Sequence, residues 1–323
     1  MIAHDDLLLA SALSGAVRIF AAQALPLAAL YLGAAGRPSW AQVRAIGPVH
    51  FEAVLPDDAQ GLARGDESSP PLELDLGDSH FHCHEDGSAM VTIRADHQAG
   101  DPRHIPLAMD FAFAQQWARL GHACIHGALL EVDGAGVLVL GQRGAGKSVL
   151  ASSALVAGGR IVSDDQILVG VRDGALVGER IRAFLSLRQS WAARTLFEGS
   201  NDTWRLNRSG NRAFLAIDAA SDRFPDHGHI DHLWLLTRPR AGRQTHSTLA
   251  AISQAELFAA LVTATQPLLL GPDFPHERRQ LQDLFTHLLQ ARSIARLETG
   301  QDIVQNSKAT WQGLLARAAS MLV

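Results

Sequence analysis

Short apolar runs separated by turn residues fill the middle of the chain, and they predict buried strands. Val137–Leu140 is continuously apolar, which is typical of a strand buried on both faces. Ile125–Val132 predicts a strand before it, and Asp133-Gly134 between the two is a strong hairpin signal. After a glycine-rich loop, Val149–Val156 predicts a helix that ends at Gly158-Gly159. We therefore expect a hairpin followed by a loop and a helix.

The same patterns predict an α/β domain over residues 108–323. A short apolar strand from Arg160 ends in two adjacent aspartates, and a second tight turn follows at Arg172–Ala175. The remaining apolar periodicities predict two strands, Ile230–Thr237 and Ser293–Leu297, and four helices, Asp110–Leu120, Ser253–Ala264, Glu277–Gln290 and Ser307–Ser320.

Residues 1–107 predict a small, mostly β region. Leu7–Ala10 favours a helix by propensity, whereas Val17–Phe20 alternates like a strand. A polar loop, rich in proline and glycine, is expected at Pro56–Pro71. The clearer strand patterns are Gln42–Ile46, Leu72–Leu76 and Ala89–Arg94.

Composition narrows the class of protein. The chain has 323 residues, 47% of them hydrophobic and 19% charged, which is typical of a globular protein with a sizeable core. The net charge of −5 argues against a protein that binds nucleic acid through bulk charge. The two cysteines, Cys83 and Cys124, are too few for a disulfide framework and fit a reducing compartment.

The apolar stretch Leu7–Leu32 raises the question of a signal peptide or a membrane span. Asp5 and Asp6 stand where a signal peptide carries positive charge, Arg18 lies in mid-stretch, and Pro26 interrupts it. We therefore expect core-forming structure here, no membrane span, and a cytoplasmic protein.

The loop between the hairpin and the helix fits the pattern of a phosphate-binding loop. Two glycines, Gly141 and Gly146, are separated by four residues and followed by Lys147 and Ser148. Glycines allow the backbone N–H groups to approach phosphate oxygens, and the following helix directs its positive end at the same anion. The expected ATP-binding residues are Gly141, Gln142, Arg143, Gly144, Ala145, Gly146, Lys147, Ser148 and Val149.

Five side chains are candidates for the chemistry of phosphoryl transfer. Lys147 would neutralise the β- and γ-phosphates, and Ser148 would ligate Mg²⁺. Asp164 and Asp165 follow a strand after the loop helix, and such a pair can supply one metal ligand and one proton acceptor. Asp165 is named as the metal ligand, but the sequence does not decide which aspartate takes which role. His126 lies on the hairpin strand that pairs with the loop strand, and it is the fourth candidate catalytic residue besides Lys147 and the two aspartates.

Other polar clusters have simpler interpretations. Arg238, Arg240 and Arg243 follow a strand end, where they could meet phosphoryl charge, but a solvated basic loop is the interpretation that the sequence favours. Two groups of histidines could bind a metal, but polar strand faces are favoured for both: His80, His82 and His84, and His227, His229 and His232.

The span from Ile125 to Val169 resembles the catalytic core of bacterial HPr kinase/phosphorylase. The matching features are His126-Gly127, the loop from Gly141 to Ser148, and Asp164-Asp165. The resemblance implies a P-loop kinase domain of the HPr kinase and phosphoenolpyruvate carboxykinase type, with a mixed sheet. It also implies that the aspartates and the histidine surround the transferred phosphoryl group and Mg²⁺, and that the protein forms a homo-oligomer.

Two departures from the family pattern bear on the substrate. Val149-Leu150 follow the loop serine where HPr kinases carry an acidic residue, and Glu179–Phe184 lacks the glycines of their Glu-x-x-Gly-x-Gly segment. The chain is more similar to HPr-kinase-like proteins of peptide-maturation clusters, such as lasso precursor peptide kinases, on the strength also of Val43–Val49. We therefore expect transfer to a serine of a peptide or protein other than HPr. The alternatives are a small-metabolite kinase and a non-catalytic ATP-binding sensor or scaffold.

Overall fold

The structure is a computed structural model. It describes residues 118, 121–180, 222–238, 244–265 and 277–321 with their side chains. Of ten further strands and of residues 275–276 it describes the backbone. The chain divides into two compact units: Met1–Cys124 with Ile181–Ala183 and Gln266–Leu284, and Ile125–Arg180 with Phe184–Thr265 and Phe285–Val323.

The first unit contains a seven-stranded sheet in the order β1-β2-β3-β4-β7-β6-β5. Its pairs are antiparallel except β2 with β3. The strand patterns at Gln42–Ile46, Leu72–Leu76 and Ala89–Arg94 correspond to β3, β5 and β7. The helical propensity of Leu7–Ala10 is wrong, because residues 7–11 pair in register with residues 15–19 and this pairing overrides local preference. The strands are β1 Leu7–Ser11, β2 Gly15–Ile19, β3 Gln42–Gly47, β4 His50–Val54, β5 Leu72–Asp75, β6 Ser79–Cys83 and β7 Ala89–Ile93.

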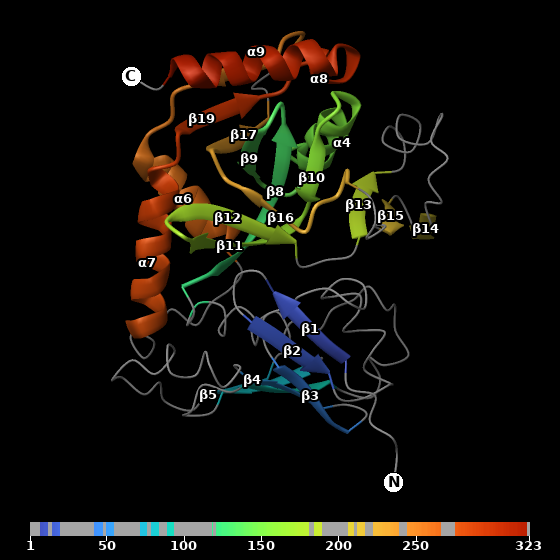
Figure 1. Cartoon of the computed structure of the whole chain (residues 1–323), viewed down its shortest axis with the longest axis vertical. Helices are drawn as coiled ribbons and strands as arrows, with labels where there is room; N and C mark the ends of the chain where they lie inside the picture. Colours follow the sequence, from blue (N-terminus) through green and yellow to red (C-terminus); the bar gives the residue numbers. More distant parts are fainter. Residues whose placement is uncertain are drawn as a thin grey trace. The chain divides into compact units, whose positions relative to one another are not determined.

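The second unit is built on a nine-stranded mixed sheet in the order β16-β12-β11-β8-β9-β17-β19-β18, with β10 paired to β8 (Figure 1). A mixed α/β sheet with helices was predicted and is confirmed. The strands are β8 Ala123–Val132, β9 Ala135–Leu140, β10 Arg160–Ser163, β11 Gln166–Arg172, β12 Ala175–Arg180, β16 His227–His229, β17 His232–Thr237, β18 Thr248–Ala250 and β19 Ser293–Glu298.

Two tight turns shape this sheet as the sequence predicts. Asp133 and Gly134 adopt positive φ values of 50° and 79°, and they join β8 to β9 as an antiparallel hairpin. Asp173 and Gly174 do the same between β11 and β12, with φ values of 51° and 77°. The next neighbours of β9 are parallel, since β17 pairs with β9 and β19 pairs with β17.

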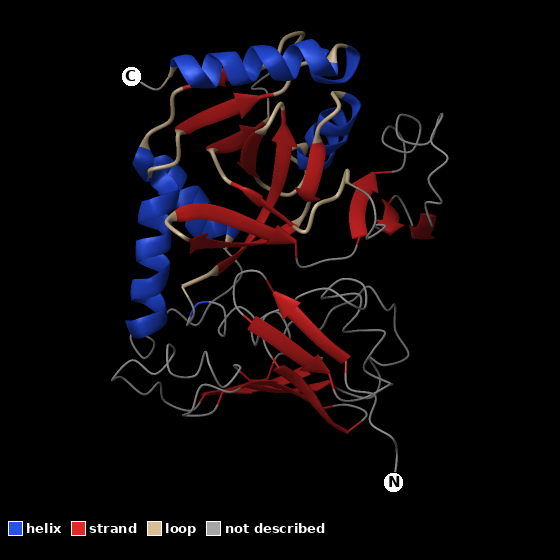
Figure 2. Ribbon diagram, viewed as in Figure 1, coloured by secondary structure: helices blue, strands red, loops and turns tan. Residues whose placement is uncertain are grey.

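Helices pack against the central strands (Figure 2). One hydrophobic cluster joins alternate residues of β8, β9 and β17 to α4, α8 and α9, and Trp234 stacks on Trp311 at its centre with ring centroids 5.9 Å apart. Residues of opposite parity, such as Leu138, are also fully buried and point to the other face. The helices are α4 Lys147–Val156, α6 Gln254–Ala264, α7 Pro275–Leu289, α8 Asp302–Gln305 and α9 Ser307–Ser320.

The helices predicted at Val149–Val156, Ser253–Ala264, Glu277–Gln290 and Ser307–Ser320 are confirmed as α4, α6, α7 and α9. Asp110–Leu120 and Pro56–Pro71 lie outside the described residues, apart from helical Ala118. A small sheet was not predicted: β13 Phe184–Arg188, β15 Arg212–Ala216 and β14 Leu206–Ser209.

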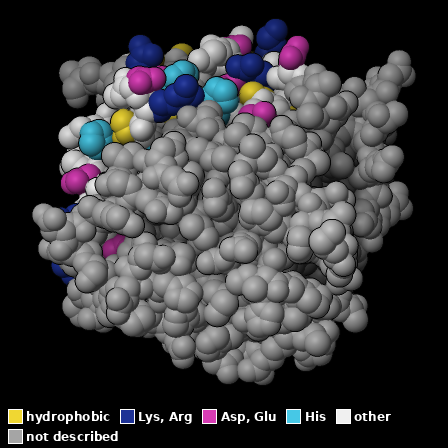
Figure 3. All heavy atoms as spheres, turned by 60° about the horizontal axis from the view of Figure 1, so that its bottom comes forward, with side chains coloured by type: hydrophobic (Ala, Val, Ile, Leu, Met, Phe, Trp, Pro, Cys, Tyr) yellow, Lys and Arg dark blue, Asp and Glu magenta, His cyan; other side chains and the backbone are white. Residues whose placement is uncertain are grey.

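The described residues also bear on membrane insertion and on the distribution of surface charge. Among the described residues, no helix combines the length and the hydropathy that a membrane crossing requires. On the face shown in Figure 3, described side chains of both charge signs are intermixed with histidines.

Candidate active site

The phosphate-loop pattern forms a tight backbone turn between β9 and α4. Gly144 and Gly146 have φ values of 81° and 116°, which glycine tolerates without strain. Gly141 is confined by close packing, because a Cβ there would lie 2.9 Å from the carbonyl oxygen of Leu236. Gly146 caps α4 without a side-chain hydrogen bond, and the first turn of the helix contains no acidic residue. The free N–H groups of this helix end can therefore receive an anion.

Lys147 begins α4 and is almost fully buried, with 7% of its surface exposed. Its Nζ donates to the carbonyl oxygen of Gly141 at 2.5 Å and is hydrogen-bonded to Nε2 of His126 at 3.0 Å. Burial lowers the pKa of this amine, while the negative charges of Asp165 and Asp164 act in the opposite direction. The lysine is thus held in place by its own loop and by the neighbouring strand.

His126 reaches the loop because of the hairpin. Gly127, its neighbour on β8, pairs with Leu140, the last residue of β9 before the loop. Nδ1 of His126 lies 3.2 Å from Oδ1 of Asp165, and the backbone N–H of Gly127 donates to the carbonyl oxygen of Asp165 at 3.0 Å. Asp165, His126 and Lys147 therefore form one chain of polar contacts.

The two aspartates occupy the turn between β10 and β11 and differ in exposure. Asp164 is buried, with 4% of its surface exposed, whereas the side chain of Asp165 is 28% exposed. The hydroxyl of Ser163 closes the turn by donating to the carbonyl oxygen of Gln166. Ser148 is half-buried in the first turn of α4, next to Lys147. The other expected ATP-binding residues lie in the loop, except Val149, which is part of α4. The side chains of Gln142, Arg143 and Val149 are exposed.

Arg238 lies closer to the loop than the sequence indicates. Its Nη2 donates to the carbonyl oxygen of Gly144 at 3.2 Å. Arg238 is exposed, as the solvated interpretation predicts, and it also contacts the phosphate loop, because β17 runs parallel to β9 and its carboxyl end lies beside that loop. Arg240 and Arg243 lie outside the described residues. The signal that could identify Arg238 is its position directly after an apolar strand.

The histidines of the two predicted groups differ in exposure and in how far the structure describes them. His227 and His229 are exposed on β16, whereas His232 is buried and its Nδ1 is hydrogen-bonded to Oγ of Ser293 at 2.8 Å. Within the residues described with side chains, no group of three or more His, Cys, Asp or Glu residues is arranged to hold a metal ion. His80 and His82 lie on β6, whose side chains are not described, and His84 lies outside the described residues.

One polar residue beside the aspartates was not predicted from the sequence. Gln166 directly follows Asp165 and is 8% exposed, and its buried Oε1 has no hydrogen-bond partner among the described atoms. A buried acceptor without a partner is costly in a folded protein. The signal in the sequence is a polar residue in the first position of an otherwise apolar strand, Gln166–Arg172.

Comparison with known proteins points to one family. The family model of the HPr Serine kinase C-terminal domain matches residues 119–189. The HPr kinase/phosphorylase of Geobacter sulfurreducens is 45% identical over 60 residues, which are 18% of this chain and 19% of that protein. The HPr kinase/phosphorylase of Clostridium botulinum is 39% identical over 54 residues, 17% of this chain and 18% of the relative. The similarity thus spans about a fifth of the length of these relatives.

A solved structure was also matched. The Hpr(Ser) kinase/phosphatase from Coxiella burnetii is 13% identical, with a TM-score of 0.31, and the match covers 60% of this chain and 94% of that one. The matched family segment, residues 119–189, contains the hairpin, the phosphate loop and both aspartates. The resemblance that the sequence predicts is confirmed by the sequence matches, which make residues 119–189 similar to the HPr Serine kinase C-terminal domain.

Proposed function

We propose that the chain is an ATP- and Mg²⁺-dependent kinase that transfers the γ-phosphoryl group to a serine hydroxyl of a peptide or protein. The observation that carries the proposal is the chain of contacts from Asp165 through His126 to Lys147. It joins a candidate proton acceptor to the lysine of a phosphate loop. Such a combination serves phosphoryl transfer, where positioning and electrostatic stabilisation supply most of the catalysis.

The residues at the loop fit ATP and Mg²⁺. The uncapped amino end of α4 offers N–H donors to phosphate oxygens, and Lys147 offers a positive charge beside them. Ser148 and one aspartate are the oxygen ligands available to a magnesium ion. When bound, the ion neutralises charge on the phosphates. Arg238, which donates to Gly144 of the loop, is a second cation beside the phosphates.

The different exposure of the two aspartates suggests how they divide the remaining roles. Asp165 is partly exposed and is oriented by His126, so it can accept a proton from an incoming hydroxyl. Asp164 is buried, and we assign it to the metal together with Ser148. The sequence names Asp165 as the metal ligand without deciding between the two aspartates, and their exposures favour Asp164.

We infer the acceptor from the proteins that match this chain in sequence. The matching family model is named for an HPr Serine kinase, and the relatives are named HPr kinase/phosphorylase. The departures at Val149-Leu150 and at Glu179–Phe184 argue against HPr itself as the acceptor. A serine in a precursor peptide is the acceptor that we propose.

Transfer of labelled phosphate tests the proposal. The protein is incubated with γ-³²P-ATP, Mg²⁺ and peptides encoded near its gene, and label on peptide serine is measured. Lys147→Ala should reduce transfer at least about a hundredfold, because a cation that stabilises the transition-state charge is lost. Lys308→Ala is the matched control, since Lys308 is an exposed lysine on α9 and should leave transfer unchanged.

The other outcomes separate the alternatives. Label on a small hydroxylated metabolite, with none on any peptide, would indicate a metabolite kinase. Tight ATP binding without transfer to either class would indicate a sensor or scaffold. Equal transfer by Lys147→Ala and the unmodified protein would contradict the assignment of the loop.

A further inference from the structure

A cavity of about 340 Å³ lies in the second unit, at the opposite end of the central strands from the phosphate loop. β9 begins beside the cavity at Ala135 and ends at Leu140, where the loop starts. At about 3.3 Å per residue, the two ends of β9 are roughly 17 Å apart. A small molecule in the cavity would therefore not meet the reacting phosphoryl group. Its lining residues are Asp133, Ala135, His232, Arg292, Gln312, Leu315 and Ala319.

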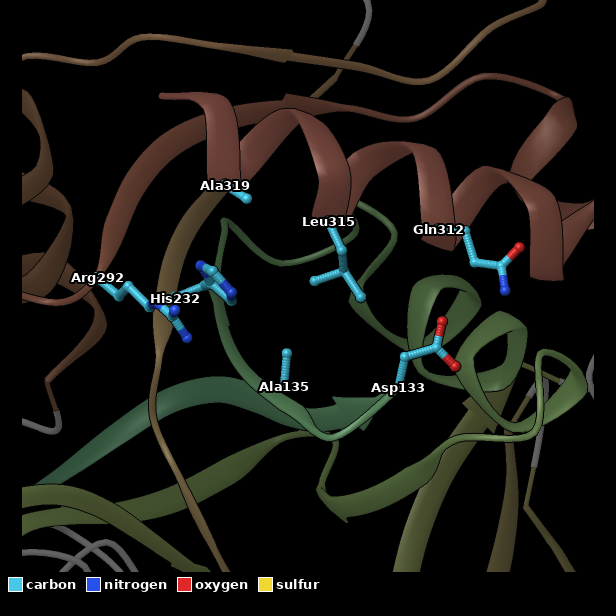
Figure 4. A pocket seen from close by; sticks show the side chains of 7 residues that line it. All are labelled: Asp133, Ala135, His232, Arg292, Gln312, Leu315 and Ala319. Carbon is cyan, nitrogen blue, oxygen red and sulfur yellow. The ribbon is translucent and has the colours of Figure 1, made fainter. Parts of the chain in front are cut away.

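Three parts of the fold form the walls of this cavity (Figure 4). The turn of the β8–β9 hairpin contributes Asp133 and Ala135. The paired strand starts of β17 and β19 contribute His232 and, directly before β19, Arg292. The third wall is α9, from which Gln312, Leu315 and Ala319 project on one side of the helix.

The two charged residues that line the cavity lack polar partners in the described part of the chain. Some other described arginines pair with carboxylates, as Arg160 does with Glu131 and Arg296 with Glu256. Asp133 and Arg292 have no hydrogen bond or ion pair with another residue in the described part of the chain. Figure 4 shows them on either side of Leu315, whose side chain projects between them. The cavity thus has a negative group and a positive group separated by apolar surface.

His232 adds a neutral polar group at the positive end. It is 5% exposed, and its Nδ1 is engaged by Ser293. Burial lowers the pKa of the imidazole and the charge of Arg292 acts in the same direction, against the effect of Asp231. Burial thus favours the neutral form of the ring, and Arg292 supplies a fixed positive charge at this end.

We propose that this cavity binds a small zwitterion whose carboxylate and ammonium groups are separated by an apolar stem, as in an ω-amino acid or a short peptide. The carboxylate would pair with Arg292, whose planar guanidinium suits bidentate contact. The ammonium would pair with Asp133, and the stem would pack on Leu315. Small-molecule sites have this composition, with mostly apolar walls and a few polar groups that fix orientation. The proposal is independent of the proposed kinase activity.

Calorimetric titration of the full chain with 6-aminohexanoate tests the site. We expect saturable binding of one molecule. Hexanoate and hexylamine, which each lack one charge, should bind at least about tenfold more weakly. Absence of saturable binding of 6-aminohexanoate, or equal binding of the singly charged probes, would overturn the proposal.

Variants locate the binding. Arg292→Met and Asp133→Asn should each weaken 6-aminohexanoate about tenfold or more, and asparagine tolerates the positive φ of position 133. Leu315→Trp should abolish binding by filling the cavity. Arg317→Met changes an exposed arginine of α9 outside the lining, and it should bind as the unmodified chain does. Thermal unfolding confirms that each variant is folded, and unchanged affinity in folded Arg292→Met and Asp133→Asn would place the probe elsewhere and overturn the assignment.

Discussion

The two ends of the central sheet differ in whether their charged side chains have partners within the described part of the chain. At the phosphate-loop end, Lys147 is hydrogen-bonded to His126, which contacts Asp165, and Arg238 donates to Gly144. At the hairpin-turn end, charged side chains line a cavity without ion-pair partners among the described residues. A ligand at the first end must replace internal contacts, whereas a ligand at the second would supply contacts that the chain leaves open.

The difference follows from burial. An almost fully buried ammonium group is costly unless opposite charges and hydrogen bonds compensate it. Lys147 is buried, and Asp164 and Asp165 provide that compensation. Asp133 and Arg292 are exposed, so water solvates them and no internal partner is needed. Pre-formed contacts therefore suit a site that must position reacting groups, and open charges suit reversible binding.

The largest expected effect comes from a substitution of Asp165 at the phosphate-loop end, which we call the interlocked end because its charged side chains contact one another or the loop. Asp165→Asn removes the proposed proton acceptor and the charge that orients His126. We expect single-turnover phosphoryl transfer to fall roughly 10²- to 10⁴-fold, which is the usual contribution of general acid–base catalysis. ATP affinity should change little, because the loop amides and Lys147 remain.

The control for this variant is Asp173→Asn. Asp173 lies in the exposed β11–β12 turn, and its side chain is 94% exposed, so the same chemical change should leave turnover intact. Normal turnover in Asp165→Asn would exclude Asp165 as the proton acceptor. Loss of turnover in Asp164→Asn that higher Mg²⁺ restores would support the assignment of Asp164 to the metal.

A second, smaller effect is expected at the hairpin-turn end, which we call the open end, where a hydrogen bond joins two strands. Oδ2 of Asp231 accepts a hydrogen bond from the backbone N–H of Gly136 at 2.8 Å, and this ties the start of β9 to the start of β17. Asp231→Ala should lower the free energy of unfolding by about 1–3 kcal/mol, because the Gly136 donor loses its partner. Chemical denaturation measures this change, and ATP affinity measured on the same variant should be retained.

Asp231→Asn is the matched variant, since its amide oxygen can still accept the bond. It should lose less stability than Asp231→Ala. Equal losses in the two variants would show that the charge, rather than the hydrogen bond, matters at this position.

The interlocked end is the part that the sequence predicts well. Its signals are local: the Asp-Gly turn fixes the hairpin, and the glycine spacing fixes the loop before α4. Once the hairpin pairs in register, His126 must lie near the end of β9, and the strand before Asp165 pairs with the same β8. The proximity of these residues was therefore predictable from patterns within about 40 residues of sequence.

The open end was not predictable, because it joins distant segments. Asp133, His232, Arg292 and Leu315 belong to four separate stretches, and although Asp133 is part of the Asp-Gly turn, no local motif indicates that the four lie together. The contact of Arg238 with Gly144 likewise depends on the parallel pairing of β17 with β9, which spans almost 100 residues. Leu7–Ala10 shows the same limitation, since strand pairing overrides its helical propensity. Tertiary pairing carries information that local periodicity lacks.

The smallest expected effect concerns the cost of the buried charge at the interlocked end. Burial lowers the pKa of Lys147 in the folded chain below the ordinary value of 10.5, which it keeps in the unfolded chain. At pH values between the folded-state pKa and the unfolded-state pKa, the unfolded chain therefore binds more protons at this lysine than the folded chain does. Lys147 therefore makes the free energy of unfolding rise with pH in that interval. The rise is reduced by Asp165 and Asp164, which favour the charged amine.

Urea denaturation at a series of pH values up to 10.5 measures this contribution. Lys147→Met keeps an unbranched side chain of similar length without the charge, so the pH slope should be less positive than in the unmodified chain. Lys308→Met, on the exposed face of α9, is the control and should retain the slope. An unchanged slope in Lys147→Met would mean that the contacts with Gly141, His126 and the aspartates compensate the burial completely, and that the charge at this end of the sheet is held without cost to the fold.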